Sequence, residues 1–353
     1  MIERLSIVAA SHGLEMCPDL AKRGPVFRSL QNRHGYCFGH RWGRDLIMLQ
    51  ATDVEIERVL REFADAEVLN NVFVRNARGY FFDFAAMLLE NARSLDRPLI
   101  AGLNGSQGSG KSTLAAFLRR VINECSDYDC HVISIDDFYL TKDARQALAS
   151  NVHPLLATRG VPGTHDVGAM RSIIDRFKSN EFGSIELPVF DKLLDDRAKT
   201  VQTINFGAKR SIVLVEGWCV GVPAQATEVL SQPISHFESV NDTEAIWRHY
   251  VNESLATDYA DLFSELDCLS MLNPPSFETV YDWRVDQEMR LVQARSSMGT
   301  DPDAKGMNPR QIREFVENFR RVSLHAIDAL PGIADFGWHL RADRLITDQW
   351  SSI

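Results

Sequence analysis

Residues 105–112 read Gly-Ser-Gln-Gly-Ser-Gly-Lys-Ser and match the phosphate-binding pattern G-x-x-x-x-G-K-[ST]. The pattern follows a short apolar segment, residues 99–103, and opens a stretch with helical spacing, residues 111–124. Glycines let backbone N–H groups approach phosphate oxygens closely, and the N-terminus of a helix favours a bound anion. Because a chance match would rarely stand between a strand and a helix, the sequence predicts a nucleotide-binding loop here.

The loop also predicts which residues hold the nucleotide. Lys111 is expected to reach the β- and γ-phosphates, and Ser112 is expected to coordinate Mg²⁺. The residues expected to surround the phosphates are Gly105, Ser106, Gln107, Gly108, Ser109, Gly110, Lys111, Ser112 and Thr113. ATP and Mg²⁺ are therefore the predicted cofactors.

Short apolar strands alternate with helical segments after this point. We expect strands over residues 99–103, 131–135 and 211–215, a fourth over 266–272 and a fifth over 344–346. Such alternation is typical of a parallel sheet covered by helices on both faces. The predicted fold class is α/β, a P-loop nucleotide-binding domain with a central, mostly parallel sheet flanked by helices.

The chain before the loop has a different pattern. Residues 54–67 and 81–95 carry apolar side chains at helical spacing, and the second stretch is followed by the break Asp-Arg-Pro at 96–98. We therefore expect a helical N-terminal region over residues 1–95 and a P-loop domain over residues 96–353.

Composition limits the class of partner. With 38 basic and 48 acidic residues the formal net charge is −10, which argues against a nucleic-acid-binding surface. No apolar run approaches the roughly 18 residues that span a bilayer, and residues 5–10 are too few for a signal peptide. The six cysteines include no CxxC pair and are typical of free thiols in a reducing compartment. We expect a cytoplasmic enzyme of small molecules, with no nucleic-acid or membrane partner.

Acidic residues follow two of the expected strands. Asp136 and Asp137 come after the second strand and Glu216 after the third, at the sheet edge where ligands bind. Adjacent aspartates point in different directions, so we expect one to be catalytic and one structural. Glu216 is a candidate to hold Mg²⁺ with Ser112, directly or through water; its alternative role is to cap a helix.

The segment Ser-Ile-Asp-Asp-Phe-Tyr-Leu-Thr at 134–141 resembles the D-x-F-[YH] region of uridine kinases, pantothenate kinases and phosphoribulokinases. The chain is more similar still to D-glycerate 3-kinases of the plant type and their bacterial and fungal relatives. The segments that carry this similarity lie at 134–141, 151–166, 188–192, 213–218 and 281–284, within about residues 95–345. The most specific part is Arg-Gly at 159–160 with Gly-Thr-His-Asp at 163–166.

The resemblance implies an ATP-dependent kinase that phosphorylates D-glycerate to 3-phosphoglycerate by direct in-line transfer. It implies that Asp136 accepts or orients the proton of the substrate hydroxyl, and that Arg284 and Arg290 belong to a lid around residues 278–325 that closes over the phosphates. The implied substrate-binding residues are Asp137, Tyr139, Arg159, His165, Asp166, Lys192 and Arg197.

Each of these assignments has a structural alternative. Tyr139 is also a candidate core aromatic residue, and the arginines are candidates for surface ion pairs or a solvated helix face. A cluster of Arg159, His165, Lys192 and Arg197 would give a local positive pocket for a carboxylate. Other acceptors remain open, namely a nucleoside, pantothenate or another hydroxy acid. A non-catalytic ATP-binding regulatory protein is a further open alternative, but the presence of Lys111, Asp136 and Glu216 argues against it.

Overall fold

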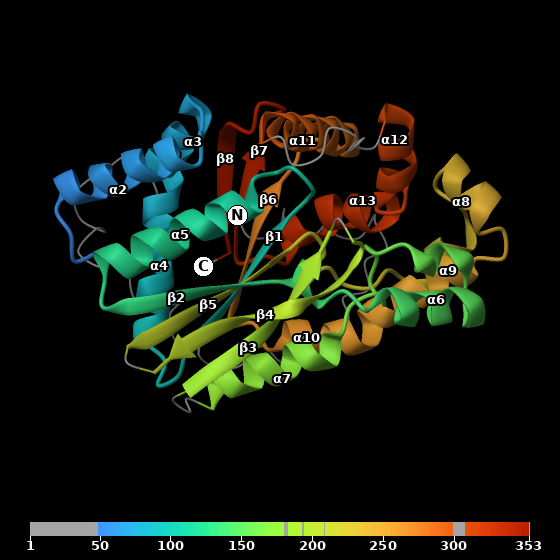
Figure 1. Ribbon diagram of the computed structural model, residues 1–353, viewed down its shortest axis with the longest axis horizontal. Coiled ribbons are helices and arrows are strands. Elements are labelled where there is room, and N and C mark those ends of the chain that lie inside the picture. Colours follow the sequence, from blue (N-terminus) through green and yellow to red (C-terminus); the bar gives the residue numbers. More distant parts are fainter. Residues whose placement is uncertain (1–48, 180–182, 193, 208, 299–307, 353) are drawn as a thin grey trace, which may run out of the picture. The chain divides into compact units, whose positions relative to one another are not determined.

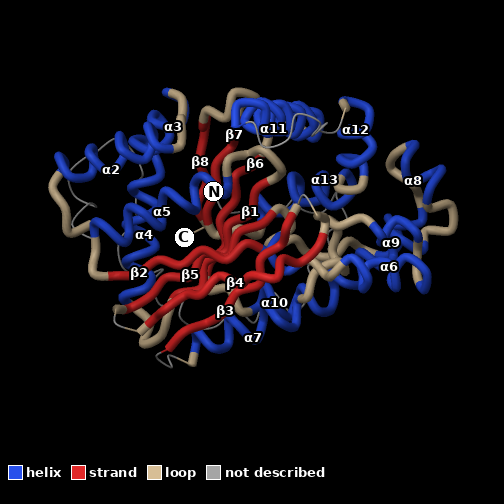
Figure 2. The backbone as a smooth tube through the Cα atoms, in the orientation of Figure 1, coloured by secondary structure: helices blue, strands red, loops and turns tan. Residues whose placement is uncertain are grey.

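A six-stranded sheet in the order β2-β5-β1-β6-β7-β8 forms the centre of the fold. The computed structural model describes residues 49–179, 183–192, 194–207, 209–298 and 308–352. The strands are β1 (Leu99–Gly105), β2 (Tyr128–Ser134), β5 (Arg210–Gly217), β6 (Cys268–Asn273), β7 (Phe336–Leu340) and β8 (Ile346–Ser351). All neighbouring pairs are parallel except β7 with β8, so the prediction of a mostly parallel sheet is confirmed. Figure 2 shows the strands together at the centre with helices around them.

Helices cover both faces of the sheet because its central strands are apolar on both sides. Every residue of β1 is buried, and successive side chains of a strand point to opposite faces. Ile100 belongs to a core cluster with α7 (Val167–Lys178) and α13 (Arg320–Ala329). On the other side, α4 (Phe82–Arg93) and α5 (Lys111–Cys125) contact β1 (Figure 1).

The helices before β1 pack on α5. They are α2 (Asp53–Ala66), α3 (Asn71–Asn76), the π-helical turn η4 (Ala77–Phe81) and α4. Phe117 of α5 is fully buried, with its ring 5.3 Å from that of Phe63 and 5.4 Å from that of Phe82. The two helices expected before β1 are thus present, whereas the first 48 residues of the predicted helical region lie outside the described residues.

Two expected strands begin later than predicted, and three strands were not predicted. The strand expected from 266 begins at Cys268, and the one expected at 344–346 begins at Ile346, because Arg344 is in a left-handed turn with φ 68°. Strand β7 and the antiparallel hairpin of β3 (Gly183–Asp191) and β4 (Asp196–Phe206) were not predicted. The hairpin is exposed along much of its length, so it lacks the continuous apolar run of a buried parallel strand.

The hairpin contacts η5 (Ile135–Phe138), the turn that follows β2. Four of its side chains, Ile185, Leu187, Ile204 and Phe206, join the core cluster, and the ring of Phe206 lies 4.9 Å from that of Phe177 in α7. The pairing register shifts between Pro188 and Phe190, which bends the end of β3. The turn of the hairpin is thereby held beside the carboxyl end of β2.

The remaining helices and helical turns lie between and after the strands along the chain. They are α6 (Lys142–Asn151), η6 (Pro154–Ala157), η7 (Thr227–Ser231), α8 (His236–Asn241), α9 (Ile246–Ser254), η8 (Leu255–Tyr259), α10 (Ala260–Ser264), α11 (Phe277–Met298), α12 (Pro309–Glu317) and η9 (Leu330–Gly332). The range 278–325, predicted to be a lid, covers α11, α12 and the start of α13, and its residues 299–307 lie outside the described residues. Phe277, Ile312 and Val316 form a separate small core here. No helix in the described part of the chain is long and apolar enough to cross a membrane.

Arg145 ties the turn of the hairpin to α6. Its side chain is fully buried, and its guanidinium donates to the carbonyl oxygens of Leu140 and Ala157 and to the carboxylate of Asp195. Asp195 lies at the turn with φ 54°, a left-handed conformation that aspartate tolerates better than most residues. Arg145 therefore anchors the turn through a buried polar network.

Replacing this arginine by methionine should destabilise the protein measurably. Arg145→Met leaves buried carbonyl oxygens without a donor, so we expect the free energy of unfolding in urea to fall by roughly 2 kcal/mol. The control is Arg171→Met, which removes an exposed ion pair with Asp261 and should cost less than about 1 kcal/mol. Equal losses in the two variants would contradict the anchoring role.

Candidate active site

The phosphate-binding loop has a backbone that only glycine accepts easily at two positions. It runs from the end of β1 to the start of α5, and Gly108 and Gly110 have φ of 73° and 96°. A Cβ on Gly105 would lie 2.6 Å from the Oγ of Ser109. The loop therefore depends on glycine for its backbone conformation at Gly108 and Gly110 and for space at Gly105.

Several polar side chains of the loop are buried without a partner in the described part of the chain. They are the Oγ atoms of Ser106 and Ser109 and the Oε1 of Gln107. Buried polar atoms are normally hydrogen-bonded, and here they surround the N-terminus of the 15-residue helix α5. The unsatisfied atoms, the helix terminus and Lys111 together fit a polyphosphate.

Ser112 and Glu216 form the candidate metal site. The hydroxyl of Ser112 donates to Oε1 of Glu216 over 2.9 Å, and Oε2 of Glu216 is buried without a hydrogen-bond partner among the described residues. Lys111 Nζ lies 3.9 Å from the same Oε2. A hydroxyl beside an incompletely satisfied carboxylate is a donor set that suits Mg²⁺ bound together with phosphate oxygens.

Ser134, the last residue of β2, pairs with Glu216 of β5. Asp136 lies two residues further along the chain. Lys192 of the hairpin places its Nζ 2.7 Å from Oδ2 of Asp136. Burial would raise the pKa of Asp136, but the charges of Lys192 and Lys111 outweigh burial and lower the pKa to about 2. The carboxylate is therefore ionised throughout the neutral range and is a good hydrogen-bond acceptor but a weak base.

Asp137 has a different environment. Burial raises the pKa of its carboxyl group, and its Oδ1 accepts the backbone N–H of Phe190 in the hairpin over 3.3 Å. The two adjacent aspartates thus point to different partners. Asp137 holds the hairpin, whereas Asp136 meets two lysine charges beside the phosphate-binding loop.

Tyr139 and His165 stack beside Asp136. Their ring centres are 4.3 Å apart with an interplanar angle of 22°, and the Tyr139 hydroxyl donates to Oδ1 of Asp136 over 3.3 Å. Burial lowers the pKa of His165 to about 4, although the charge of Asp136 opposes this shift. His165 is therefore neutral near pH 7 and adds no positive charge to the pocket expected from the sequence.

The two arginines expected to bind a carboxylate each already contact one. Arg159 pairs with Asp195 at the turn of the hairpin. Arg197 donates to Asp166 over 3.0 Å and to the carbonyl oxygen of Tyr139. Asp166 also caps the N-terminus of α7 by accepting the N–H of Ala169. The structure thus brings these side chains to the edge of the Asp136 cluster, with their charges partly neutralised.

Helix α11 meets the phosphate-binding loop through a tryptophan. A Cβ on Gly108 would lie 2.6 Å from Cβ of Trp283, and Arg344 donates from Nε to the carbonyl oxygen of Gly108 over 2.6 Å. Arg284, the next residue, pairs with Glu288 at 2.8 Å. The side chain of Arg290 lies outside the described residues.

Several residues of this site were not found from the sequence. They are Arg145, Asp195, Tyr259, Trp283 and Arg344, and none lies in a motif with a chemical signature of its own. Trp283 lies within a segment that resembles glycerate kinases, so that resemblance was the one available signal.

The fold and the phosphate-binding loop define a P-loop nucleotide-binding protein. No protein-family model matches the chain. It is 33% identical over 231 residues to the uncharacterized kinase mug58 of Schizosaccharomyces pombe, covering 63% of this chain and 79% of that protein. It is 30% identical over 238 residues to the probable ATP-dependent kinase TDA10 of Saccharomyces cerevisiae, covering 63% and 75%.

The chain belongs to the family of P-loop kinases that includes these two yeast proteins. Its fold is similar to that of D-glycerate 3-kinase from Cryptococcus neoformans var. grubii serotype A. The TM-score is 0.64 and the identity 24%, and the match covers 76% of this chain and 96% of that one. The resemblance predicted from the sequence is thus confirmed for the fold, and the class of enzyme is a kinase.

Two glycines of the loop test its contact with α11. Both have left-handed φ, but a Cβ on Gly110 meets nothing within 4 Å, whereas one on Gly108 collides with Trp283. Gly110→Ala should cost about 1–2 kcal/mol of unfolding free energy through backbone strain alone. Gly108→Ala should cost clearly more, as measured by urea unfolding without nucleotide. Equal costs would show that Trp283 does not restrain the loop.

The low pKa of Asp136 should depend on Lys192, whose side chain is 59% exposed. In Lys192→Met the effect of burial is opposed by less positive charge, so the pKa of Asp136 should rise and protonation should begin at higher pH. The measurement is a carbon-13 NMR titration of the aspartate carboxyl groups. Lys199→Met, at an exposed site on the same hairpin, is the control. An unchanged titration of Asp136 in Lys192→Met would contradict the electrostatic assignment.

Proposed function

We propose that this kinase uses ATP and Mg²⁺ to phosphorylate D-glycerate, giving 3-phosphoglycerate by direct in-line transfer. The observation that carries this proposal is the position of Asp136, an ionised carboxylate beside the phosphate-binding loop and beside Lys111. The similarity in fold to a D-glycerate 3-kinase supports the choice of acceptor. The enzyme would act in the cytoplasm on a small molecule, with no nucleic-acid or membrane partner.

In this proposal Asp136 orients the attacking hydroxyl more than it deprotonates it. A carboxylate whose pKa is about 2 is a weak base at neutral pH, but it accepts a hydrogen bond from an alcohol well. Phosphoryl transfer has a loose transition state in which the nucleophile has lost little of its proton. The hydroxyl oxygen therefore bonds to the γ-phosphorus as the bond to ADP breaks, and its proton passes late to the carboxylate of Asp136.

Cations around the γ-phosphoryl group stabilise the transition state. Lys111 lies beside both Asp136 and Glu216, where negative charge develops on the transferring group. Ser112 and Glu216 would hold Mg²⁺, which when bound neutralises charge on the phosphate oxygens. Arg284 and Arg290 would act from the lid over residues 278–325 when the acceptor is bound.

Acceptor recognition would use the arginines at the edge of the cluster. A guanidinium has five N–H donors, so Arg159 and Arg197 keep donors after pairing with Asp195 and Asp166. The carboxylate of glycerate would share these arginines with the protein's own carboxylates. Lys192, Tyr139, His165 and Asp137 complete the proposed acceptor side.

The experiment is an ADP-release assay with Mg·ATP across D-glycerate, glycerol, other hydroxy acids, uridine and pantothenate. D-glycerate should be the preferred acceptor, and Asp136→Asn should lower kcat by about 10²–10⁴-fold, the range for a group acting on the transferred proton. Asp137→Asn, the matched control, should lower kcat less because its carboxylate faces the hairpin. Preference for uridine or pantothenate would overturn the choice of glycerate, and a larger loss in Asp137→Asn would overturn the choice of Asp136.

A further inference from the structure

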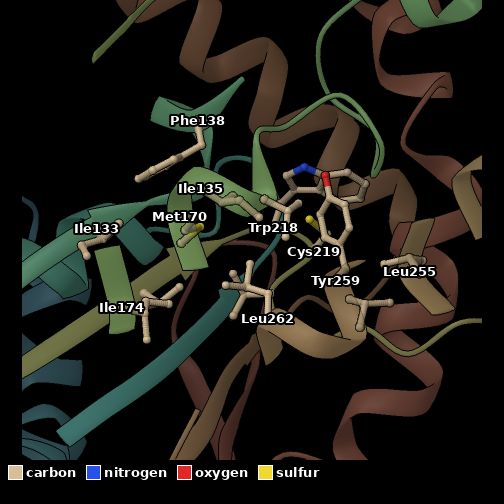
Figure 3. Packing of buried hydrophobic residues seen from close by; sticks show 14 of the residues in the cluster. Ile133, Ile135, Phe138, Met170, Ile174, Trp218, Cys219, Leu255, Tyr259 and Leu262 are labelled. Atoms are coloured by element: carbon tan, nitrogen blue, oxygen red, sulfur yellow. The ribbon is translucent and has the colours of Figure 1, made fainter. Parts of the chain in front are cut away.

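Tyr259 is a buried residue at the end of the π-helical turn η8, a kind of irregularity often found at functional sites. Figure 3 shows its ring packed among apolar side chains that include Cys219, Leu255 and Leu262. Its hydroxyl oxygen lies 3.0 Å from the backbone nitrogen of Gly163 and 2.5 Å from Nδ1 of His165. The only polar atom of this ring is thus committed to the Gly-Thr-His-Asp segment.

These two contacts determine where the histidine carries its proton. The N–H of Gly163 must donate to the Tyr259 oxygen, because a backbone amide cannot accept. The phenol has one hydrogen of its own, and donating it to Nδ1 of His165 satisfies both groups. The opposite arrangement would leave a buried hydroxyl hydrogen without a partner, which costs free energy. Nδ1 is therefore unprotonated, and the proton of the neutral ring is on Nε2.

The Nε2 atom of His165 is buried and has no hydrogen-bond partner among the described residues. The whole residue is 5% exposed, and its ring stacks on Tyr139, which donates to Asp136. Buried N–H donors are rarely left unpaired. The ring therefore carries an N–H donor that is unpaired within the described part of the chain, and it stacks on Tyr139, the residue that binds Asp136.

We propose that Tyr259 is a positioning residue that holds neutral His165 in the Nε2–H form, so that His165 donates this hydrogen to an oxygen of the phosphoryl acceptor. The inference rests on the proposed kinase reaction. It specifies the chemistry of the acceptor, which must offer an oxygen lone pair, from a hydroxyl or a carboxylate group, in addition to the hydroxyl that attacks. An acceptor without that oxygen leaves a buried donor unpaired and is discriminated against.

The test compares two tyrosines that bind the same turn. Tyr250 donates to the carbonyl oxygen of Gly163 and contacts the same residue, but it makes no hydrogen bond to His165. Tyr259→Phe should raise the KM for the acceptor about 10-fold and leave the KM for ATP unchanged. Tyr250→Phe should change neither by more than about two-fold. A 10-fold rise corresponds to about 1.4 kcal/mol, which is within the range for the loss of one hydrogen bond.

Nitrogen-15 NMR of the histidine ring reads the tautomer directly and needs no acceptor. In the wild-type protein Nε2 of His165 should be protonated and Nδ1 should not, and Tyr259→Phe should give a mixture of the two forms. His165→Gln, which keeps a neutral N–H donor, should retain a lower acceptor KM than His165→Phe.

Two results would overturn the inference. One is a wild-type spectrum with the proton on Nδ1. The other is an equal rise in acceptor KM in Tyr259→Phe and Tyr250→Phe, because both tyrosines would then merely support the turn. A spectrum with Nε2 protonated in a protein that phosphorylates no hydroxylated acceptor would instead contradict the proposed function, so the two failures are distinguishable.

Discussion

Two carboxylates and the phosphates of a bound nucleotide would lie at one edge of the sheet. The rest of the site depends on the positive charges that compensate these negative charges. Asp136 follows β2, Glu216 lies near the end of the neighbouring strand β5 where it pairs with Ser134, and the polyphosphate of a nucleotide would lie beside them. Lys111 from α5 and Lys192 from the hairpin supply the nearest positive charges. Their attraction keeps Asp136 ionised despite its burial, so the electrostatics of the sheet edge require the loop and the hairpin to be in place.

The hairpin is consequently part of the active site and not an appendage. Arg145 and Arg159 hold its turn through Asp195, and Asp137 binds the backbone of Phe190. These contacts fix the position of the hairpin turn, and therefore the position of Lys192 relative to Asp136. A change that loosens the hairpin turn would therefore change the pKa of Asp136 in η5. The local stability of the hairpin is in this way linked to the chemistry of the site.

The features that were predicted correctly are those that depend on a short stretch of sequence. The phosphate-binding loop, the buried parallel strands and the acidic residues that follow them are each encoded within about ten residues, and the sheet confirms the fold class. The hairpin was missed because its half-exposed strands lack an apolar run. Lys192 and Asp136 were both named from the sequence but their ion pair was not predicted, and Tyr259 was not named at all. Its contact with His165 joins residues 94 positions apart, a pairing that periodicity does not show.

The central claim is that ATP and a hydroxylated acceptor meet directly, with Asp136 aiming the hydroxyl and Lys111 beside the phosphoryl group. The most direct measurement is the stereochemical course at the γ-phosphorus, followed with ATP made chiral at that atom and the acceptor that the enzyme prefers. A single in-line displacement predicts inversion of configuration. Retention would contradict direct transfer, because it requires two displacements through a phosphorylated residue of the protein.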